Sequence, residues 1–270
     1  MSSDRSADLE VLIRVAQSVQ VTFRKSSGSP HRADVVAMGA DGTPTEEVDR
    51  EAEAQILASL DREGVDWDLL SEEAGLVHRG GGEILVADPI DGSHNALRGL
   101  PYATVSLALG RENLGGIDVA VVRDLYRGTT YWAVRGGGAY KDGRRLKTRT
   151  WAPKAELLFL NLGRHATERV VRLAARARRV RSLGCASLEM LAVAEGAADA
   201  YLFENDTPGR NLRVTDIAAS YRILLEAGGD ASDLSGQPLS ALPLSLAQRS
   251  SVLAWADPAF VASARQDGSL

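Results

Sequence analysis

The chain has 270 residues, of which 44% are hydrophobic and 25% are charged, a composition typical of a soluble globular enzyme. Its formal net charge of −5 argues against a nucleic-acid scaffold, because such proteins usually carry a basic surface. The single cysteine, Cys185, excludes an internal disulfide and fits a reducing compartment. No apolar run approaches the roughly 18 residues of a membrane helix, and residues 1–10 lack a secretory pattern. We therefore expect a cytoplasmic protein with no membrane or nucleic-acid partner.

The first half of the chain is predicted to contain helices followed by a mainly antiparallel sheet. Apolar residues recur at helical spacing from Leu9 to Phe23 and from Val48 to Leu60. Between them, residues 26–44 are rich in Gly, Ser and Pro and predict a loop with a short extended piece at 34–38. Four β-rich runs then follow between turn signals, at residues 83–87, 104–109, 117–122 and 129–134.

The second half alternates between strands and helices. Strands are predicted at residues 157–162, 200–203 and 251–256, and helices at 167–178, 187–195 and 216–227. Such alternation indicates an α/β layer. We therefore predict an α/β (α+β) fold in which residues 1–150 form an N-terminal α+β half and residues 151–270 a C-terminal α/β half, packed as one compact unit.

Two carboxylates follow the apolar run at residues 83–87. Asp88 comes directly after it, and Pro89 cannot extend a β-ladder, so a turn is predicted there. Asp91 lies within the same turn, and the carbonyl of Ile90 between the two offers a third oxygen. Mg²⁺ takes such oxygen ligands and keeps waters that a substrate phosphate can replace. The segment predicts a site for a hard cation.

Gly92 and Ser93 follow the second carboxylate at once and add the means to bind an anion. They present backbone N–H groups and a hydroxyl, and a helix that begins at Ser93 would favour a phosphate at its N-terminus. Further acidic candidates are Glu72-Glu73, Asp216 and Asp49. Each candidate alone also fits a plain structural role: a turn at residues 88–92, a solvated loop at Glu72, a helix N-cap at Asp216 and an exposed helix position at Asp49.

Taken together, these motifs resemble the inositol monophosphatase superfamily of Mg²⁺-dependent, Li⁺-sensitive phosphatases. In that family a Glu-Glu element precedes a strand that ends in Asp-Pro-Ile/Leu-Asp-Gly-Thr/Ser, and a later Asp opens a helix that ends in Glu-Ala-Gly-Gly. This sequence has Glu72-Glu73, Asp88 to Ser93, and Asp216 through Gly229 in that order. Residues 39–45 resemble archaeal members described as dual inositol monophosphatase and fructose-1,6-bisphosphatase enzymes. Ala96 and Thr215 depart from a usual Phe and Trp, which affects the shape of the pocket.

The resemblance implies a layered αβαβα sandwich of the sugar-phosphatase type that binds two or three Mg²⁺ ions. Glu72, Asp88 and the Ile90 carbonyl would hold one ion, and Asp88, Asp91 and Asp216 a second, with Glu72 assisting a third through water. The implied catalytic residues are Asp49, Glu72 and Ser93, with Ser93 orienting the attacking water. The N–H groups of Gly92 and Ser93 would bind the phosphate.

The resemblance further implies a small phosphorylated substrate and a homodimer. The alcohol of the substrate would contact Gly184, Cys185 and Ala186, and Arg164 or Arg213 would meet a second phosphate. The predicted function is hydrolysis of a polyol or sugar phosphate, such as inositol 1-phosphate or fructose 1,6-bisphosphate. The alternatives are a 3′-phosphoadenosine or NADP phosphatase that uses the same site, and a catalytically silent metal- or phosphate-binding regulator.

Overall fold

A computed structural model describes residues 3–26, 31, 33–40, 42, 44–207 and 209–270 of the chain. Its larger sheet has eight strands in the order β10-β9-β8-β7-β6-β5-β3-β4. Every neighbouring pair is antiparallel except β3 and β5, which run parallel. The strands are β3 (Asp68–Ser71), β4 (Gly75–Val77), β5 (Ile84–Asp91), β6 (Thr104–Gly110), β7 (Ile117–Asp124), β8 (Thr130–Val134), β9 (Gly138–Lys141) and β10 (Arg144–Arg145).

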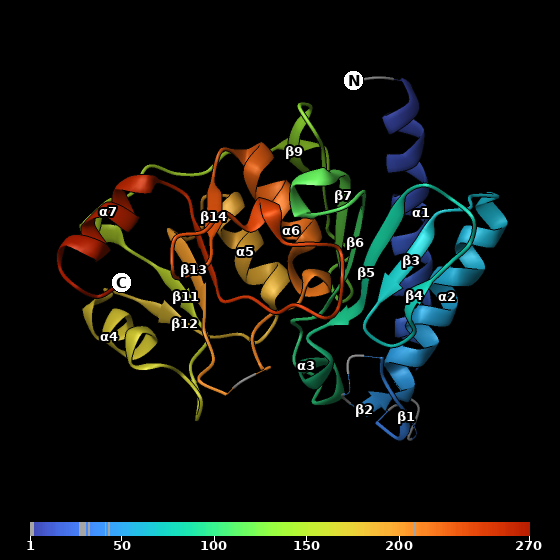
Figure 1. Cartoon of the computed structure of the whole chain (residues 1–270), viewed down its shortest axis with the longest axis horizontal. Coiled ribbons are helices and arrows are strands. Elements are labelled where there is room, and N and C mark those ends of the chain that lie inside the picture. Colours follow the sequence, from blue (N-terminus) through green and yellow to red (C-terminus); the bar gives the residue numbers. More distant parts are fainter. Residues whose placement is uncertain (1–2, 27–30, 32, 41, 43, 208) are drawn as a thin grey trace.

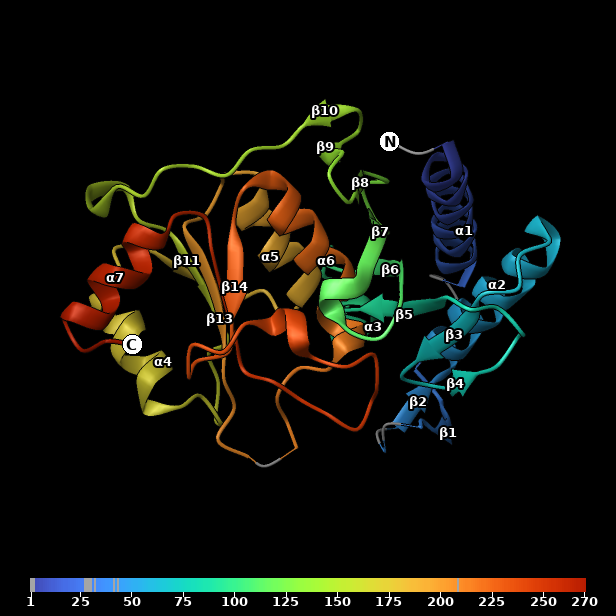
Figure 2. The same cartoon turned by 45° about the horizontal axis from the view of Figure 1, so that its top comes forward.

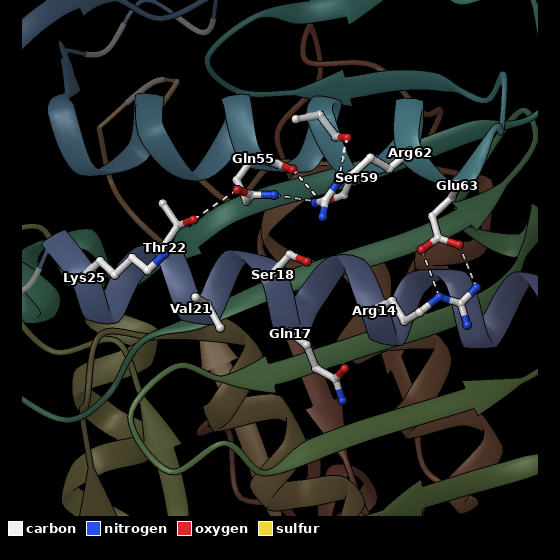
Figure 3. A pocket seen from close by; sticks show the side chains of 11 residues that line it. Arg14, Gln17, Ser18, Val21, Thr22, Lys25, Gln55, Ser59, Arg62 and Glu63 are labelled. Carbon is white, nitrogen blue, oxygen red and sulfur yellow. Dashed lines mark hydrogen bonds and ion pairs between the residues drawn. The ribbon is translucent and has the colours of Figure 1, made fainter.

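Two long helices, α1 (Ser3–Ser26) and α2 (Glu47–Glu63), cover one face of this sheet (Figure 1). The apolar stripe that predicts them is buried: Leu12 and Val19 of α1 and Ile56 and Leu60 of α2 are fully enclosed. Side chains also link the two helices on their outer side, where Figure 3 shows Arg14 in a bidentate pair with Glu63 at 2.9 and 2.7 Å. The groove between the helices, about 540 Å³, is lined by none of the predicted site residues.

Helices α5 (Ala186–Ala194) and α6 (Val214–Ala227) form a middle layer against the opposite face of the large sheet. Eleven of the fourteen residues of α6 are buried, as expected for a helix packed on several sides. Beyond this layer lies a five-stranded sheet in the order β12-β11-β13-β15-β14. Its strands are β11 (Leu158–Leu160), β12 (Val180–Arg181), β13 (Ala200–Phe203), β14 (Asp230–Ser232) and β15 (Val252–Trp255).

The outermost layer consists of α4 (Glu168–Arg176) and α7 (Pro258–Gln266), which lie on the far face of the smaller sheet (Figures 1 and 2). The predicted αβαβα sandwich is thereby confirmed. The remaining elements are β1 (Val35–Met38), β2 (Pro44–Glu46), the five-residue α3 (Ser93–Leu97), and the 3₁₀ turns at Leu114–Gly116, Pro153–Ala155 and Leu239–Ala241. Among the described residues, no helix is long and apolar enough to cross a membrane.

Two local predictions are wrong. The predicted turn at Pro89 does not form, since β5 continues through Asp91. Helix α6 begins at Val214, two residues before its predicted start: Arg213 is the N-cap, and Asp216 lies inside the first turn, where it accepts the N–H of Arg213. The extended piece predicted at residues 34–38 is confirmed as β1, which pairs antiparallel with β2.

Candidate active site

The segment Asp88–Asp91 contains a β-bulge that controls the direction of both carboxylates. In β5, Asp88 pairs with Ser106 and Asp91 with Thr104, so three steps along β5 match two steps along β6. In a regular strand, residues three apart point to opposite faces. The extra residue of the bulge removes this alternation and turns both side chains to the same face. A bulge is also where a strand tolerates Pro89, which has no N–H to donate.

Two further elements bring their carboxylates to the same place. Strand β3 runs parallel to β5, with Ser71 opposite Ala87. Glu72 comes directly after Ser71 and Asp88 directly after Ala87, so the two acidic residues occupy neighbouring positions on the two chains. Asp216 comes from the first turn of α6, on the other side of the site. Its Oδ2 accepts a hydrogen bond from the N–H of Arg213 at 2.7 Å, which fixes the carboxylate at the start of the helix.

These side chains line one cavity of about 680 Å³ between the two halves of the chain. The lining contains Asp49, Glu72, Asp88, Ile90, Asp91, Gly92, Ser93, Gly184, Cys185, Ala186, Arg213 and Asp216. Arg164 is not among the residues that line the cavity and lies exposed on the loop after β11. The structure therefore brings together every residue predicted for the site except Arg164.

Burial and mutual repulsion dominate the electrostatics of this cavity. Burial and the charges of Glu72, Asp91 and Asp216 raise the pKa of Asp88 well above its usual value. Burial also raises the pKa of Glu72 to about 8, opposed by the charge of Arg213. The pKa of Asp91 rises to about 6 for the same reason, although hydrogen bonds from Ser187 oppose the shift. The charged forms of these carboxylates are therefore unfavourable in the metal-free site, and a bound cation would stabilise them.

We expect the metal-free protein to lose stability as the pH rises from about 4 to about 8. Raised pKa values mean that the folded state binds more protons than the unfolded chain, whose carboxyls titrate near pH 4. The contribution is complete below the unfolded pKa and is lost as the pH passes about 6 for Asp91 and about 8 for Glu72. Thermal melts in chelator and in Mg²⁺ across this range test it. Mg²⁺ should raise the Tm more at pH 8 than at pH 6, and an equal increase at both would contradict the prediction.

Ser93 connects the bulged strand to α2. Its Oγ lies 2.9 Å from Asp49 Oδ1 and 2.8 Å from the carbonyl oxygen of Ile90, and its single proton serves one of them at a time. Asp49 is only 2% exposed, and burial raises its pKa to about 8. This arrangement can hold a hydroxyl in one orientation and exchange a proton with the neighbouring carboxyl.

The segment at Cys185 to Ser187 holds Asp91 from the other half of the chain. The N–H groups of Ala186 and Ser187, at the start of α5, donate to the two carboxylate oxygens of Asp91 at 3.2 and 2.6 Å. Cys185 Sγ lies 3.3 Å from the same carboxylate, and burial raises the pKa of its thiol well above the usual value. Cys185 is therefore a packed thiol that contacts a carboxylate of the site.

Two residues that were not predicted as part of the site fix this segment. Asn95, in α3, donates to the carbonyls of Leu183, Gly184 and Tyr102 at 2.7, 3.2 and 3.0 Å. The buried Glu189, in α5, accepts the N–H of Leu183 at 2.6 Å. The helices that carry Asn95 and Glu189 could be predicted from the sequence, but the hydrogen-bond partners could not. Asn95 reaches carbonyls of Leu183 and Gly184 in a distant loop, and Glu189 reaches the N–H of Leu183, which lies before α5.

The donor set fits a divalent cation. Carboxylate and carbonyl oxygens converge on the cavity, and Oδ1 of Asp88 is buried without a hydrogen-bond partner among the described residues. In the observed side-chain arrangement, no three His, Cys, Asp or Glu side chains in the described part of the chain are set to hold a metal ion. Arg213 pairs with Oε2 of Glu72, one of the two oxygens that this carboxylate offers to a metal. A metal bound through that oxygen would have to displace the guanidinium.

Fold and cavity together define a layered αβαβα protein with a carboxylate-lined site between its two larger sheets. The sequence profile of the inositol monophosphatase family matches residues 3–267. The fructose-1,6-bisphosphatase/inositol-1-monophosphatase of Methanothermobacter thermautotrophicus is 32% identical over 260 residues, with 90% of each chain covered. A solved structure of a Pyrococcus horikoshii protein with similarities for inositol-1 monophosphatase aligns with a TM-score of 0.80 and 26% identity, over 94% of this chain and 95% of that one.

The chain belongs to the inositol monophosphatase family and is a phosphoric monoester hydrolase. A further relative has a second activity in its name: the bifunctional NADP phosphatase/NAD kinase of Methanococcus maripaludis is 32% identical over 256 residues. This chain spans only 44% of the length of that relative. The phosphatase class is thus established, and its substrate is a small phosphorylated molecule.

Proposed function

We propose that the protein hydrolyses the phosphate monoester of a polyol or sugar with the help of Mg²⁺, and that inositol 1-phosphate and fructose 1,6-bisphosphate are substrates. The observation that carries this proposal is the bulge in β5, which turns Asp88 and Asp91 to one face of the strand beside Glu72 and Asp216. Four carboxylates around one cavity are the ligand set that a two-metal phosphatase needs. The name of the Methanothermobacter relative supports the two substrates.

In the proposed mechanism, Asp88, Asp91, Asp216, Glu72 and the Ile90 carbonyl would hold two Mg²⁺ ions, and Glu72 would assist a third through water. Bound Mg²⁺ supplies the charge that favours a deprotonated water and stabilises the attacking and leaving oxygens. The residues of the chain provide the orientation. Ser93, together with Asp49, directs the lone pair of the water at the phosphorus.

The phosphate itself meets the backbone of Gly92 and Ser93. Gly92 has φ of 90°, which turns the chain sharply from β5 into α3 and leaves the start of that turn facing the cavity. Its N–H and that of Ser93 would hold the non-bridging oxygens as charge develops on them. Gly184, Cys185 and Ala186 form the wall on the alcohol side.

A second candidate is an NADP phosphatase, favoured by the similarity to the Methanococcus bifunctional protein. It would use the same carboxylates on a 2′-phosphate and would need room for a dinucleotide. The cytoplasmic location, the homodimer and the division at residue 150 remain predictions from the sequence.

A substrate panel tests the proposal. We expect Mg²⁺-dependent phosphate release from inositol 1-phosphate and fructose 1,6-bisphosphate, inhibited by Li⁺, with kcat/KM at least about tenfold above that for NADP⁺. Release is measured with a coupled phosphate assay, and chelator-treated enzyme is the control. Faster release from NADP⁺ would favour the second candidate, and no release from any of the three would contradict the proposed function.

A further inference from the structure

A basic hollow adjoins the carboxylate cavity. Arg210, Arg213 and Arg249 line this hollow of about 390 Å³, together with Asn211 and Leu212. Several residues line both spaces, among them Phe203, Arg210, Arg213 and Asp216. A space lined by three arginine residues therefore opens next to one lined by carboxylate residues. Arg213 was predicted from the sequence as a basic partner of the substrate, whereas Arg249 was not.

Arg213 is the residue that connects the two. Its guanidinium donates from Nη1 to Oε2 of Glu72, although the two residues are 141 positions apart in the chain. The two side chains are 12% and 14% exposed, so water screens the pair poorly. The backbone N–H of Arg213 holds Asp216 at 2.7 Å. One residue thus contacts two carboxylates of the site, one through its side chain and one through its backbone.

The charge of Arg213 acts on the carboxylates as a bound cation would. It lowers the pKa of both Glu72 and Asp88, against the effect of burial. A guanidinium does not lose its proton under ordinary conditions, so the only way to remove its charge from Glu72 is to move the side chain. A cation that uses the same oxygen of Glu72 must compete with it.

We propose that Arg213 is a displaceable counter-ion: it neutralises Glu72 in the metal-free protein, and metal binding at Glu72 releases its guanidinium into the hollow. There it joins Arg210 and Arg249 in binding a second anionic group of the substrate, such as the distal phosphate of a sugar bisphosphate. Metal and distal anion then favour each other's binding, because both select the released position of Arg213. This proposal rests on the proposed function, since it takes Glu72 as a metal ligand.

The first test measures Mg²⁺ binding by calorimetry without substrate. Arg213→Gln should bind Mg²⁺ about tenfold more tightly than the wild-type protein, within the range of direct ion-pair couplings. Arg210→Gln is the matched control: it removes a charge from the same hollow, and Arg210 has no ion pair with a carboxylate among the described residues. Unchanged or weaker binding by Arg213→Gln, or an equal gain in Arg210→Gln, would overturn the proposal and assign Arg213 to orienting Glu72.

A double-mutant cycle removes the remaining ambiguity. In a Glu72→Gln background, Arg213→Gln should no longer increase Mg²⁺ affinity, because the competing pair is already absent. Melting temperatures in chelator show whether each variant is folded, and Arg213→Lys provides a second variant that keeps the charge. A gain in affinity that persists without the Glu72 carboxylate would contradict direct competition.

The second test compares two esters that differ only in the distal phosphate. Arg249→Gln and Arg210→Gln should lower kcat/KM for fructose 1,6-bisphosphate about tenfold more than for fructose 1-phosphate, since a distal phosphate pairs with arginine. Arg164→Gln, an exposed arginine outside the cavity, should alter neither value. Equal losses on both esters would refute the distal-anion site. Failure of the wild-type enzyme on every ester would instead refute the proposed function and leave the Mg²⁺ titration still decisive for Arg213.

Discussion

Asp88→Asn is expected to reduce turnover by well over about a hundredfold while raising the melting temperature of the metal-free protein. Loss of a residue that merely supports a metal ligand costs about 10–100-fold, and Asp88 is proposed as the ligand shared by both ions. The gain in stability has a separate cause. Asp88 is 3% exposed, and its Oδ1 has no hydrogen-bond partner among the described residues. Burial and three neighbouring carboxylates disfavour the charged form of Asp88, so folding of the metal-free protein near neutral pH costs the uptake of a proton. A neutral amide does not have this cost.

Steady-state kinetics with saturating Mg²⁺ and thermal melts in chelator measure the two effects. Asp216→Asn should also lose most activity. Asp199→Asn is the matched control, because Asp199 is fully buried just before β13, away from the cavity, and has partners: it accepts the N–H of Leu157 at 2.8 Å and pairs with Arg149 at 3.3 Å. It should lower the melting temperature and leave kcat of the folded enzyme unchanged. An Asp88→Asn enzyme with normal turnover would exclude Asp88 as a metal ligand.

Gly92→Ala is expected to destabilise the protein by about 3 kcal/mol and to abolish phosphate binding at the turn. Gly92 has φ of 90°, and a Cβ there would lie 2.6 Å from the carbonyl oxygen of Tyr102. An alanine at this position would therefore have to adopt a left-handed backbone conformation, and its Cβ would collide with the main chain at Tyr102. The two penalties fall at the junction of β5 and α3, where the catalytic segment is built.

Gly99→Ala separates these two penalties. Gly99 also has a left-handed φ of 72°, but a Cβ there would meet nothing within 4 Å. We expect it to cost only about 1 kcal/mol, the strain of the backbone alone. Chemical denaturation of both variants gives the comparison. Equal losses of stability would show that the approach of Tyr102 does not constrain Gly92.

The layers of the fold could be predicted because their helices carry long apolar stripes. The apolar stripe from Leu9 to Phe23 covers about four turns of α1, too long for a single strand. Strands β3 and β14 were not predicted. They have only four and three residues, too few to show the alternation of apolar and polar residues that marks a strand. Helix α7 had a usable signal in Asp257-Pro258, where Asp257 accepts the N–H of Ala259 and Pro258 takes the first helical position.

The chemistry of the site was predictable, whereas its internal contacts were not. The residues at Asp88, Asp91 and Asp216 stand in motifs that can be read along the chain. The contact between Arg213 and Glu72 joins two layers that only tertiary packing brings together. The turn predicted at Pro89 was wrong because a missing N–H ends a regular ladder but is compatible with a bulge.

The bulge in β5 makes the length of the motif as important as its composition. Removing one residue between Asp88 and Asp91 would restore regular pairing and realign the carboxylates with the pleat of the sheet. Adding one would shift the register of everything that follows into α3. A protein engineer who grafts or shortens this segment must therefore preserve the count of residues first and the acidic side chains second. The spacing determines which face of the strand each carboxylate points to, and a substitution elsewhere in the strand does not change that spacing.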